Sequence, residues 1–206
     1  ESRDRMMSPE WTADGRYILV NRLGRELEIR MYHVDGGSGV TIGGGGEGED
    51  APAGYGPVLT PDGRTLFFAQ RAGGFAGTFP NVQVARRDME TGDVDPVTQA
   101  EWGAVRPAVS PDGRHLVYAT RRDTRTGLRI RDLETGTDRW LAWPVQRDAI
   151  EGGAQSRDYL PRYDFTPDGS EVVTTRDGKI LAVRVATGEE RVIPFRADVV
   201  LPVGPD

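Results

Sequence analysis

The residues that could bind a metal ion or act as catalysts are few and scattered in this chain. His33 and His115 are its two histidines, and cysteine is absent. Metal-dependent hydrolases need several neutral imidazoles and a carboxylate around the water that the metal activates. The two histidines belong to separate strand-like segments and form no His-x-His pair. We therefore expect no metal site, no catalytic residue and no cofactor in this chain, and both histidines to be ordinary strand residues.

Two glycine-rich segments resemble catalytic motifs without matching them. Gly36–Gly39 contains Ser38 but lacks the Gly-x-Ser-x-Gly elbow of serine hydrolases. Gly43–Gly46 is not followed by the Gly-Lys-Ser/Thr of a phosphate-binding loop. We interpret 43–56 as a connection between structural units, and its acidic residues as solvated charges rather than cation ligands.

A five-residue turn sequence of the type Thr-Pro-Asp-Gly-Arg occurs four times along the chain. Its glycines are 48, 50 and 56 residues apart (15 to 63, 63 to 113 and 113 to 169), close to the length of one propeller blade. In such a turn, aspartate accepts a hydrogen bond from the backbone and glycine adopts positive φ. This assigns a structural role, not a catalytic one, to Asp14, Gly15, Asp62, Gly63, Asp112, Gly113, Asp168 and Gly169.

The segments between these turns alternate apolar and polar residues with period two, as in Leu128–Leu133. The sequence thus predicts an all-β fold, a β-propeller with four repeats of four-stranded antiparallel blades in a single domain over 1–206. The predicted blades span 6–46, 54–100, 104–146 and 160–200. Blades bury their faces by stacking, and the apolar residue four positions before each turn glycine is the expected contact: Trp11, Leu59, Val109 and Phe165.

Several phrases of the sequence resemble a known repeat family. Ser110–Ala119 and Leu128–Gly136 are similar to the repeats of TolB-like (WD40-like, PD40) propellers. Longer phrases resemble the subgroup whose propeller precedes a metal-dependent amidohydrolase barrel: Met31–Val40, Gly103–Gly113, Gln146–Asp148, Tyr159–Pro161 and Ile193–Val199. The resemblance implies a periplasmic or secreted protein, more than four blades, and a catalytic domain beyond Asp206. We accordingly expect a piece of a larger protein, an open arc of blades, and self-association through its two open blade faces.

A binding site is expected on the face of the propeller that carries the blade connections and the long loops, among which is a loop predicted for 121–127. Arg106 and Arg162 both stand seven positions before a turn glycine, and Glu10 and Asp164 stand five before. An internal ion-pair network is the alternative interpretation of these charges. The residues expected to line the channel mouth are Arg106, Arg162, Glu10, Asp164, Tyr55, Trp102, Gln146, Arg147, Asp148, Arg157 and Tyr159.

Three functions remain open at this point. The first is a substrate-gating or docking domain of an amidohydrolase-type hydrolase, with the missing blades and a C-terminal catalytic domain as partners. The second is a TolB-like scaffold that binds a protein or peptide at the channel mouth. The third, a piece of a prolyl-oligopeptidase-like serine peptidase, lacks its nucleophile and base. The net charge of −6 without a basic run argues against nucleic-acid binding, and no apolar stretch of about 20 residues predicts a membrane span.

Overall fold

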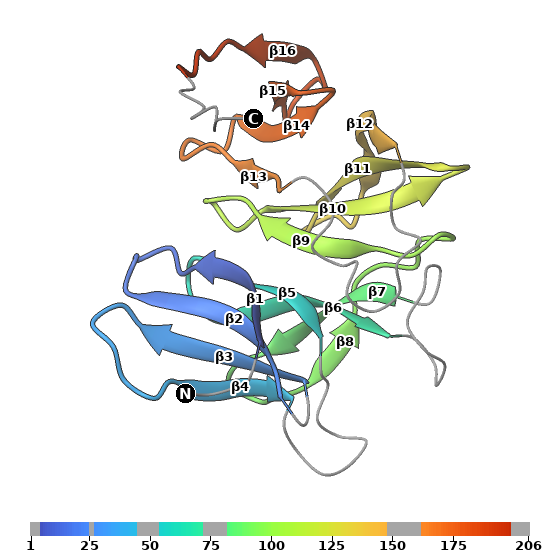
Figure 1. The fold of residues 1–206 in the computed structure, drawn as a ribbon. Coiled ribbons are helices and arrows are strands. Elements are labelled where there is room, and N and C mark those ends of the chain that lie inside the picture. Colours follow the sequence, from blue (N-terminus) through green and yellow to red (C-terminus); the bar gives the residue numbers. More distant parts are fainter. Residues whose placement is uncertain (1–4, 25–26, 45–53, 72–81, 148–161, 199–206) are drawn as a thin grey trace, which may run out of the picture.

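The computed structural model describes residues 5–24, 27–44, 54–71, 82–147 and 162–198 (Figure 1). In these ranges the chain forms four antiparallel four-stranded sheets and no helix, so none that could cross a membrane. The predicted all-β class and four-stranded blades are confirmed.

Blade 1 contains β1 (Arg5–Trp11), β2 (Tyr17–Leu23), β3 (Leu27–His33) and β4 (Val40–Gly44). Blade 2 contains β5 (Tyr55–Leu59), β6 (Thr65–Arg71), β7 (Val82–Asp88) and β8 (Val94–Pro96). Blade 3 contains β9 (Val105–Val109), β10 (His115–Arg122), β11 (Arg125–Asp132) and β12 (Asp138–Arg147). Blade 4 contains β13 (Asp164–Phe165), β14 (Glu171–Arg176), β15 (Lys179–Arg184) and β16 (Glu190–Ile193).

The four sheets are arranged as the blades of a β-propeller. Within each blade the strands lie side by side in chain order. Neighbouring blades meet through their first strands, with β1 against β5, β5 against β9, and β9 against β13. The first strand of each blade is therefore the innermost one, and the four first strands surround the axis.

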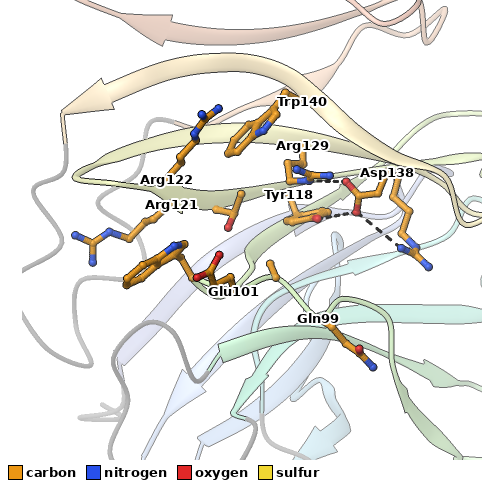
Figure 2. Close-up of a pocket in the computed structure, with 12 residues that line it drawn as sticks. Gln99, Glu101, Tyr118, Arg121, Arg122, Arg129, Asp138 and Trp140 are labelled. Atoms are coloured by element: carbon orange, nitrogen blue, oxygen red, sulfur yellow. Dashed lines mark hydrogen bonds and ion pairs between the residues drawn. The ribbon is translucent and has the colours of Figure 1, made fainter.

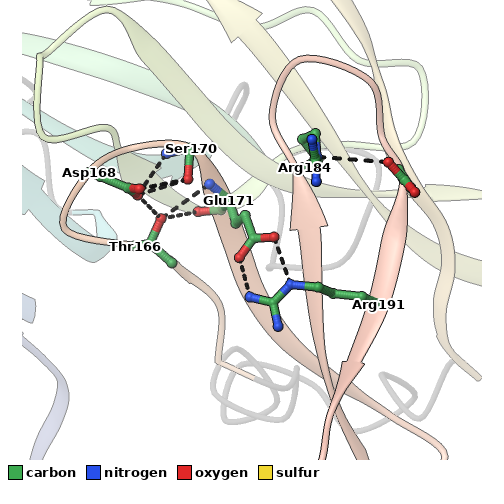
Figure 3. A network of polar contacts seen from close by, with 7 residues as sticks. Thr166, Asp168, Ser170, Glu171, Arg184 and Arg191 are labelled. Carbon is green, nitrogen blue, oxygen red and sulfur yellow. Dashed lines mark hydrogen bonds and ion pairs between the residues drawn. The ribbon is translucent and has the colours of Figure 1, made fainter.

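The repeated turn joins the first and second strands of each blade. Gly113 has a φ of +72°, and Asp112 Oδ1 accepts a hydrogen bond from the Arg114 backbone N–H at 3.0 Å. Figure 3 shows the same turn in blade 4, where Thr166 donates to Asp168 at 2.6 Å. That hydrogen bond, with those from Ser170, lowers the pKa of Asp168 to about 2. Each turn aspartate thus has the local partner that the sequence predicts.

The residue four positions before the turn glycine packs on the preceding blade. Leu59 contacts the buried cluster shared by blades 1 and 2, and Val109 contacts the cluster of blades 2 and 3. Phe165 packs on a cluster that joins blade 4 to blade 3. Trp11 occupies the same position in blade 1 and is 58% exposed. In the described part of the chain, the face of blade 1 that carries Trp11 therefore lacks the cover that the other three positions have.

At the other end of the array, the face of blade 4 that points away from blade 3 is also less buried than the equivalent faces of the other blades. The residue four positions after the turn glycine faces the next blade, and Leu19, Phe67 and Val117 are at most 3% exposed there. Val173, at the same position in blade 4, is only half-buried. The buried clusters of the described residues join blades 1 to 2, 2 to 3 and 3 to 4, and none joins 4 to 1. Among the described residues, the two uncovered faces expected from the sequence are found on blades 1 and 4.

One loop prediction is wrong. The segment 121–127 was expected to form a long loop, but β10 and β11 continue through it as a hairpin, with Arg122 paired to Arg125. The two-residue turn places Asp123 at a φ of +56°, a conformation that aspartate tolerates better than most residues. Because β10 extends to Arg122, the side chain of Arg122 lies on the same sheet face as that of Tyr118.

Replacing Gly113 by valine should destabilise the domain through backbone strain. A Cβ at this position would lie 3.8 Å from the nearest Pro61 atom, so space is not limiting. The β-branched residue at positive φ should lower the free energy of unfolding by about 1–3 kcal/mol. Gly113→Asn should cost less, because asparagine populates this region more readily. Urea unfolding of the two variants measures this, and equal losses would contradict the explanation.

Trp11 and Phe165 should respond differently to truncation although they occupy equivalent positions. Phe165→Ala removes an inter-blade contact and should lower the free energy of unfolding by about 2–4 kcal/mol. Trp11→Ala removes a mostly exposed ring and should change it by less than about 0.5 kcal/mol. The measurement is chemical denaturation at a concentration where the protein is monomeric. A large loss in Trp11→Ala would show that another element covers this face.

Candidate functional site

The innermost strands of blades 1 to 3 and the residues just before β13 of blade 4 line one small pocket at the axis, with a volume of about 30 Å³. Glu10, Arg106 and Arg162, three of the residues predicted from their position in the repeat, line it together. Its other lining residues are Ser8, Pro9, Gly56, Pro57, Pro107, Ala108 and Tyr163. The stacking of the blades thus brings charged groups from distant parts of the chain to one place.

A bulge recurs in the inner strand at this pocket. Ser8, Gly56 and Arg106 all stand seven positions before a turn glycine, and their φ values are 51°, 60° and 53°. The strand pairing shifts register at each of them. Positive φ is costly for Ser8 and Arg106, and such strain is concentrated at binding and active sites. Sequence reasoning did not include Ser8 and Gly56. The sequence feature that could have indicated the bulges is the proline that follows each bulge residue, at Pro9, Pro57 and Pro107.

Neighbouring blades hold these bulges in place. The fully buried Asn21 of blade 1 accepts a hydrogen bond from the Gly56 N–H at 2.9 Å and donates to Gly54 O at 2.6 Å. Tyr163 of blade 4 donates its buried hydroxyl to the carbonyl oxygens of Arg106 and Val105. Burial raises the pKa of the Tyr163 hydroxyl, which keeps it protonated as the donor. Tyr163 was also absent from the predicted site.

An ion pair joins the first and fourth blades across the axis. Arg162 donates to Glu10 Oε2 at 2.5 Å and to the Pro9 carbonyl oxygen at 2.7 Å. Burial raises the pKa of Glu10, Arg162 opposes this shift, and the carboxylate of Asp164 adds to it. Burial also raises the pKa of Asp164. Glu10 thus lines the axial pocket with Arg106 and Arg162, and Asp164 lies beside this group without lining the pocket, so a ligand that carries a hydrogen-bond donor can reach carboxyl groups whose charged forms are disfavoured.

The remaining predicted site residues do not all lie at the axis. Trp102 lines a different pocket, on blade 3. Tyr55 begins β5 and pairs with Ala69. Gln146 and Arg147 end β12, the outermost strand of blade 3, so their backbone is three strands from the axis. Asp148, Arg157 and Tyr159 lie outside the described residues.

The two histidines are far from the axial pocket lining. His33 ends β3 and packs edge-on against the ring of Tyr17, with 5.0 Å between the ring centroids. His115 begins β10. Within the described ranges, no three His, Asp or Glu side chains lie close enough together to hold a metal ion.

Comparison with known proteins identifies the fold. No protein-family description matches this sequence, and no curated protein matches it. TolB from Acinetobacter baumannii is 20% identical, with a TM-score of 0.69 over 93% of this chain and 44% of its own. A structure assigned to TolB from Agrobacterium tumefaciens is 18% identical, with a TM-score of 0.71 over 95% and 64%. A chain of the nidogen/laminin complex is 14% identical, with a TM-score of 0.63 over 91% and 64%.

These similarities define the class of fold, a β-propeller. Two of the similar structures are TolB proteins, which agrees at the level of the fold with the resemblance seen in the repeats. The chain spans 44% to 64% of the length of these three proteins. At 14–20% identity the similarity is evidence for the fold, and function has to be argued from the site.

The raised pKa of Glu10 predicts the direction of a pH effect. The folded state binds this proton more tightly than the unfolded chain does, so the ionised carboxyl disfavours folding. As pH rises from about 3.5 to 7, wild type should therefore lose free energy of unfolding relative to Glu10→Gln, which cannot ionise. Urea titrations across this range measure the difference between the two proteins.

Asp62→Asn is the control with the opposite sign. The Thr60 hydroxyl and the Arg64 backbone lower the pKa of Asp62, so its charged form favours folding. Wild type should keep its full stability advantage over Asp62→Asn above about pH 3.8 and lose it as pH falls below that value, so the control titrations extend into this range. If wild type also gains relative to Glu10→Gln, the axial charges act as a stabilising ion-pair network, the alternative interpretation of the sequence.

Proposed function

We propose that this chain is a binding domain that holds a peptide segment of a partner protein at the axial pocket and supplies no catalytic group. The observation that carries the proposal is the convergence of Glu10, Arg106 and Arg162 on the axial pocket, with Asp164 beside it. A lysine side chain or an amino-terminal ammonium group of a partner would stabilise the charged forms of Glu10 and Asp164, which their surroundings disfavour. The strained bulges beside it support a binding role, because strain of this kind needs a reason other than stability.

The fold supports a scaffold function. Two of the similar structures bear the name TolB, and the third comes from a complex of two proteins. A propeller presents its inner strands at an open axis, where a peptide can contact several blades at once. No described residue favours the serine-peptidase alternative.

A place within a larger hydrolase is the second part of the proposal. The phrases Met31–Val40 and Gly103–Gly113 resemble propellers that precede an amidohydrolase barrel, and the uncovered faces of blades 1 and 4 suit further blades. In this setting the domain would be periplasmic or secreted and would dock against the barrel or gate its substrate. The coding sequence after residue 206 distinguishes the two settings: a barrel with His-x-His favours the hydrolase, and a stop codon favours the free-standing scaffold.

Selection of a random displayed peptide library on the intact chain tests the axial site. We expect the selected peptides to carry lysine, or a free amino terminus that binding requires. Asp164→Asn should weaken their binding about tenfold, as expected for loss of one partly buried charge pair. Asp62→Asn, in a repeated turn of blade 2, is the matched control and should bind like wild type. Calorimetric titration measures both, and equal binding by wild type and Asp164→Asn would overturn the proposal.

A further inference from the structure

A second pocket of about 490 Å³ lies away from the axis, on the face of blade 3 that is turned toward blade 2 (Figure 2). Strands β10, β11 and β12 form its wall, with residues 99–102 of the connection from blade 2 along its side. The outermost strand of blade 2, β8, has three residues, so it covers little of this face. The volume is within the range of about 300–1,000 Å³ that is typical of small-molecule sites.

The combination of a tyrosine, an arginine and a tryptophan in this pocket is specific to blade 3. Tyr118, Arg129 and Trp140 are paired across β10, β11 and β12 and form one row on the sheet face. The equivalent row is Val20, Arg30 and Thr41 in blade 1, Phe68, Ala85 and Pro96 in blade 2, and Thr174, Leu181 and Val192 in blade 4. Blade 1 shares the central arginine, but none of the three rows has a tyrosine or a tryptophan, so the propeller fold does not require Tyr118 and Trp140 in blade 3.

The pocket is positively charged within an acidic chain. Arg121, Arg122, Arg129 and Arg131 line it with Glu101 and Asp138, so four positive charges face two negative ones for a formal balance of +2. The whole chain carries −6. A local excess of positive charge raises the concentration of small anions at the pocket.

Asp138 orients the cationic groups. Its Oδ1 accepts the Nε–H of Arg129 at 2.6 Å, and its Oδ2 accepts the Tyr118 hydroxyl at 2.7 Å. Arg131 is 3.8 Å from the same carboxylate. Asp138 engages Arg129 through Nε rather than through a terminal nitrogen, and Tyr118 belongs to the same hydrogen-bonded group. A guanidinium held in this way presents a fork that matches a carboxylate or a phosphate.

Aromatic surfaces lie beside this fork. The Arg129 guanidinium carbon is 5.2 Å from the Trp140 ring centroid, and Trp102 is 45% exposed in the same pocket. Gly127 makes room for the indole, since a Cβ there would lie 2.8 Å from the Trp140 ring. An indole face next to a cationic fork suits a ligand that combines a flat apolar ring with an anionic group.

We propose that this pocket binds a small anion in which a planar ring carries a carboxylate. The ring would lie against Trp140, and the carboxylate would accept hydrogen bonds from the terminal nitrogens of Arg129, with Arg122 at the rim. A carboxylate is favoured over a phosphate at this position because Asp138, which is bonded to Arg129, would repel a double negative charge more strongly than a single one. This site is independent of the peptide-binding function proposed for the axis.

Calorimetric titration with 2-naphthoate and its neutral analogue 2-naphthamide tests the proposal on the whole chain. Naphthoate should bind at least about tenfold more tightly than naphthamide, because the amide lacks the charge that the arginines recognise. Equal affinities, or no binding of naphthoate at millimolar concentration, would overturn the proposal. Tighter binding of 1-naphthyl phosphate than of naphthoate would overturn the assignment of the carboxylate.

Three variants locate the binding. Arg129→Gln and Arg122→Gln, the second at an exposed arginine, should each weaken the binding of naphthoate. The loss of affinity should be larger in Arg129→Gln, at least about tenfold. Arg86→Gln, an exposed arginine paired with Asp95 in blade 2, is the control and should bind like wild type. Thermal melts verify folding, and Arg122→Gln tests the site even if Arg129→Gln unfolds. Wild-type affinity in both pocket variants would overturn the proposal.

Discussion

The burial of sheet faces between neighbouring blades is the interaction on which the rest of this structure depends. A four-stranded sheet has two faces and cannot bury either one alone. Leu59, Val109 and Phe165 each place an apolar side chain on the preceding blade, and Phe67 and Val117 face the following one. This stacking lines up the first strands around one axis. The axial site exists because positions that are equivalent in the repeat become neighbours in space.

The two ends of the inner strand have opposite characters. At one end the repeated turn is relaxed, with each aspartate hydrogen-bonded within its own turn. At the other end the bulges at Ser8 and Arg106 adopt unfavourable φ, and Asn21 and Tyr163 of adjacent blades hold the inner strands there. Glu10 and Asp164 are ionisable groups at a site where burial disfavours their charged forms. Stability is thus concentrated in the turns and in the contacts between blades, and the strained, charged groups lie where a ligand can reach them.

The sequence predicts the fold well because the fold is repetitive. One turn sequence at regular spacing defines the blades, and counting from its glycine places Glu10, Arg106 and Arg162 together. Features that depend on local register were not predictable in this way. The role of Tyr163 follows from hydrogen bonds between neighbouring blades, and the extension of β10 to Arg122 follows from a tight turn at Asp123. The pocket around Trp140 depends on which residues share one row across three strands, so the repeat itself gives no signal of it. Trp102 was assigned to the axis on its loop position and lies in that pocket instead.

Native-state hydrogen exchange tests the central claim, that stability comes from stacking between neighbouring blades, most directly. The second strands form a matched set, because β2, β6, β10 and β14 occupy the same place in each blade. Strands β6 and β10 have a blade on both sides, whereas β2 and β14 belong to blades with one uncovered face. In a repeat array, amides of the end units open with a smaller free energy than those of the interior units. The account predicts that amides of β2 and β14 exchange before those of β6 and β10, and uniform protection of all four strands would contradict it.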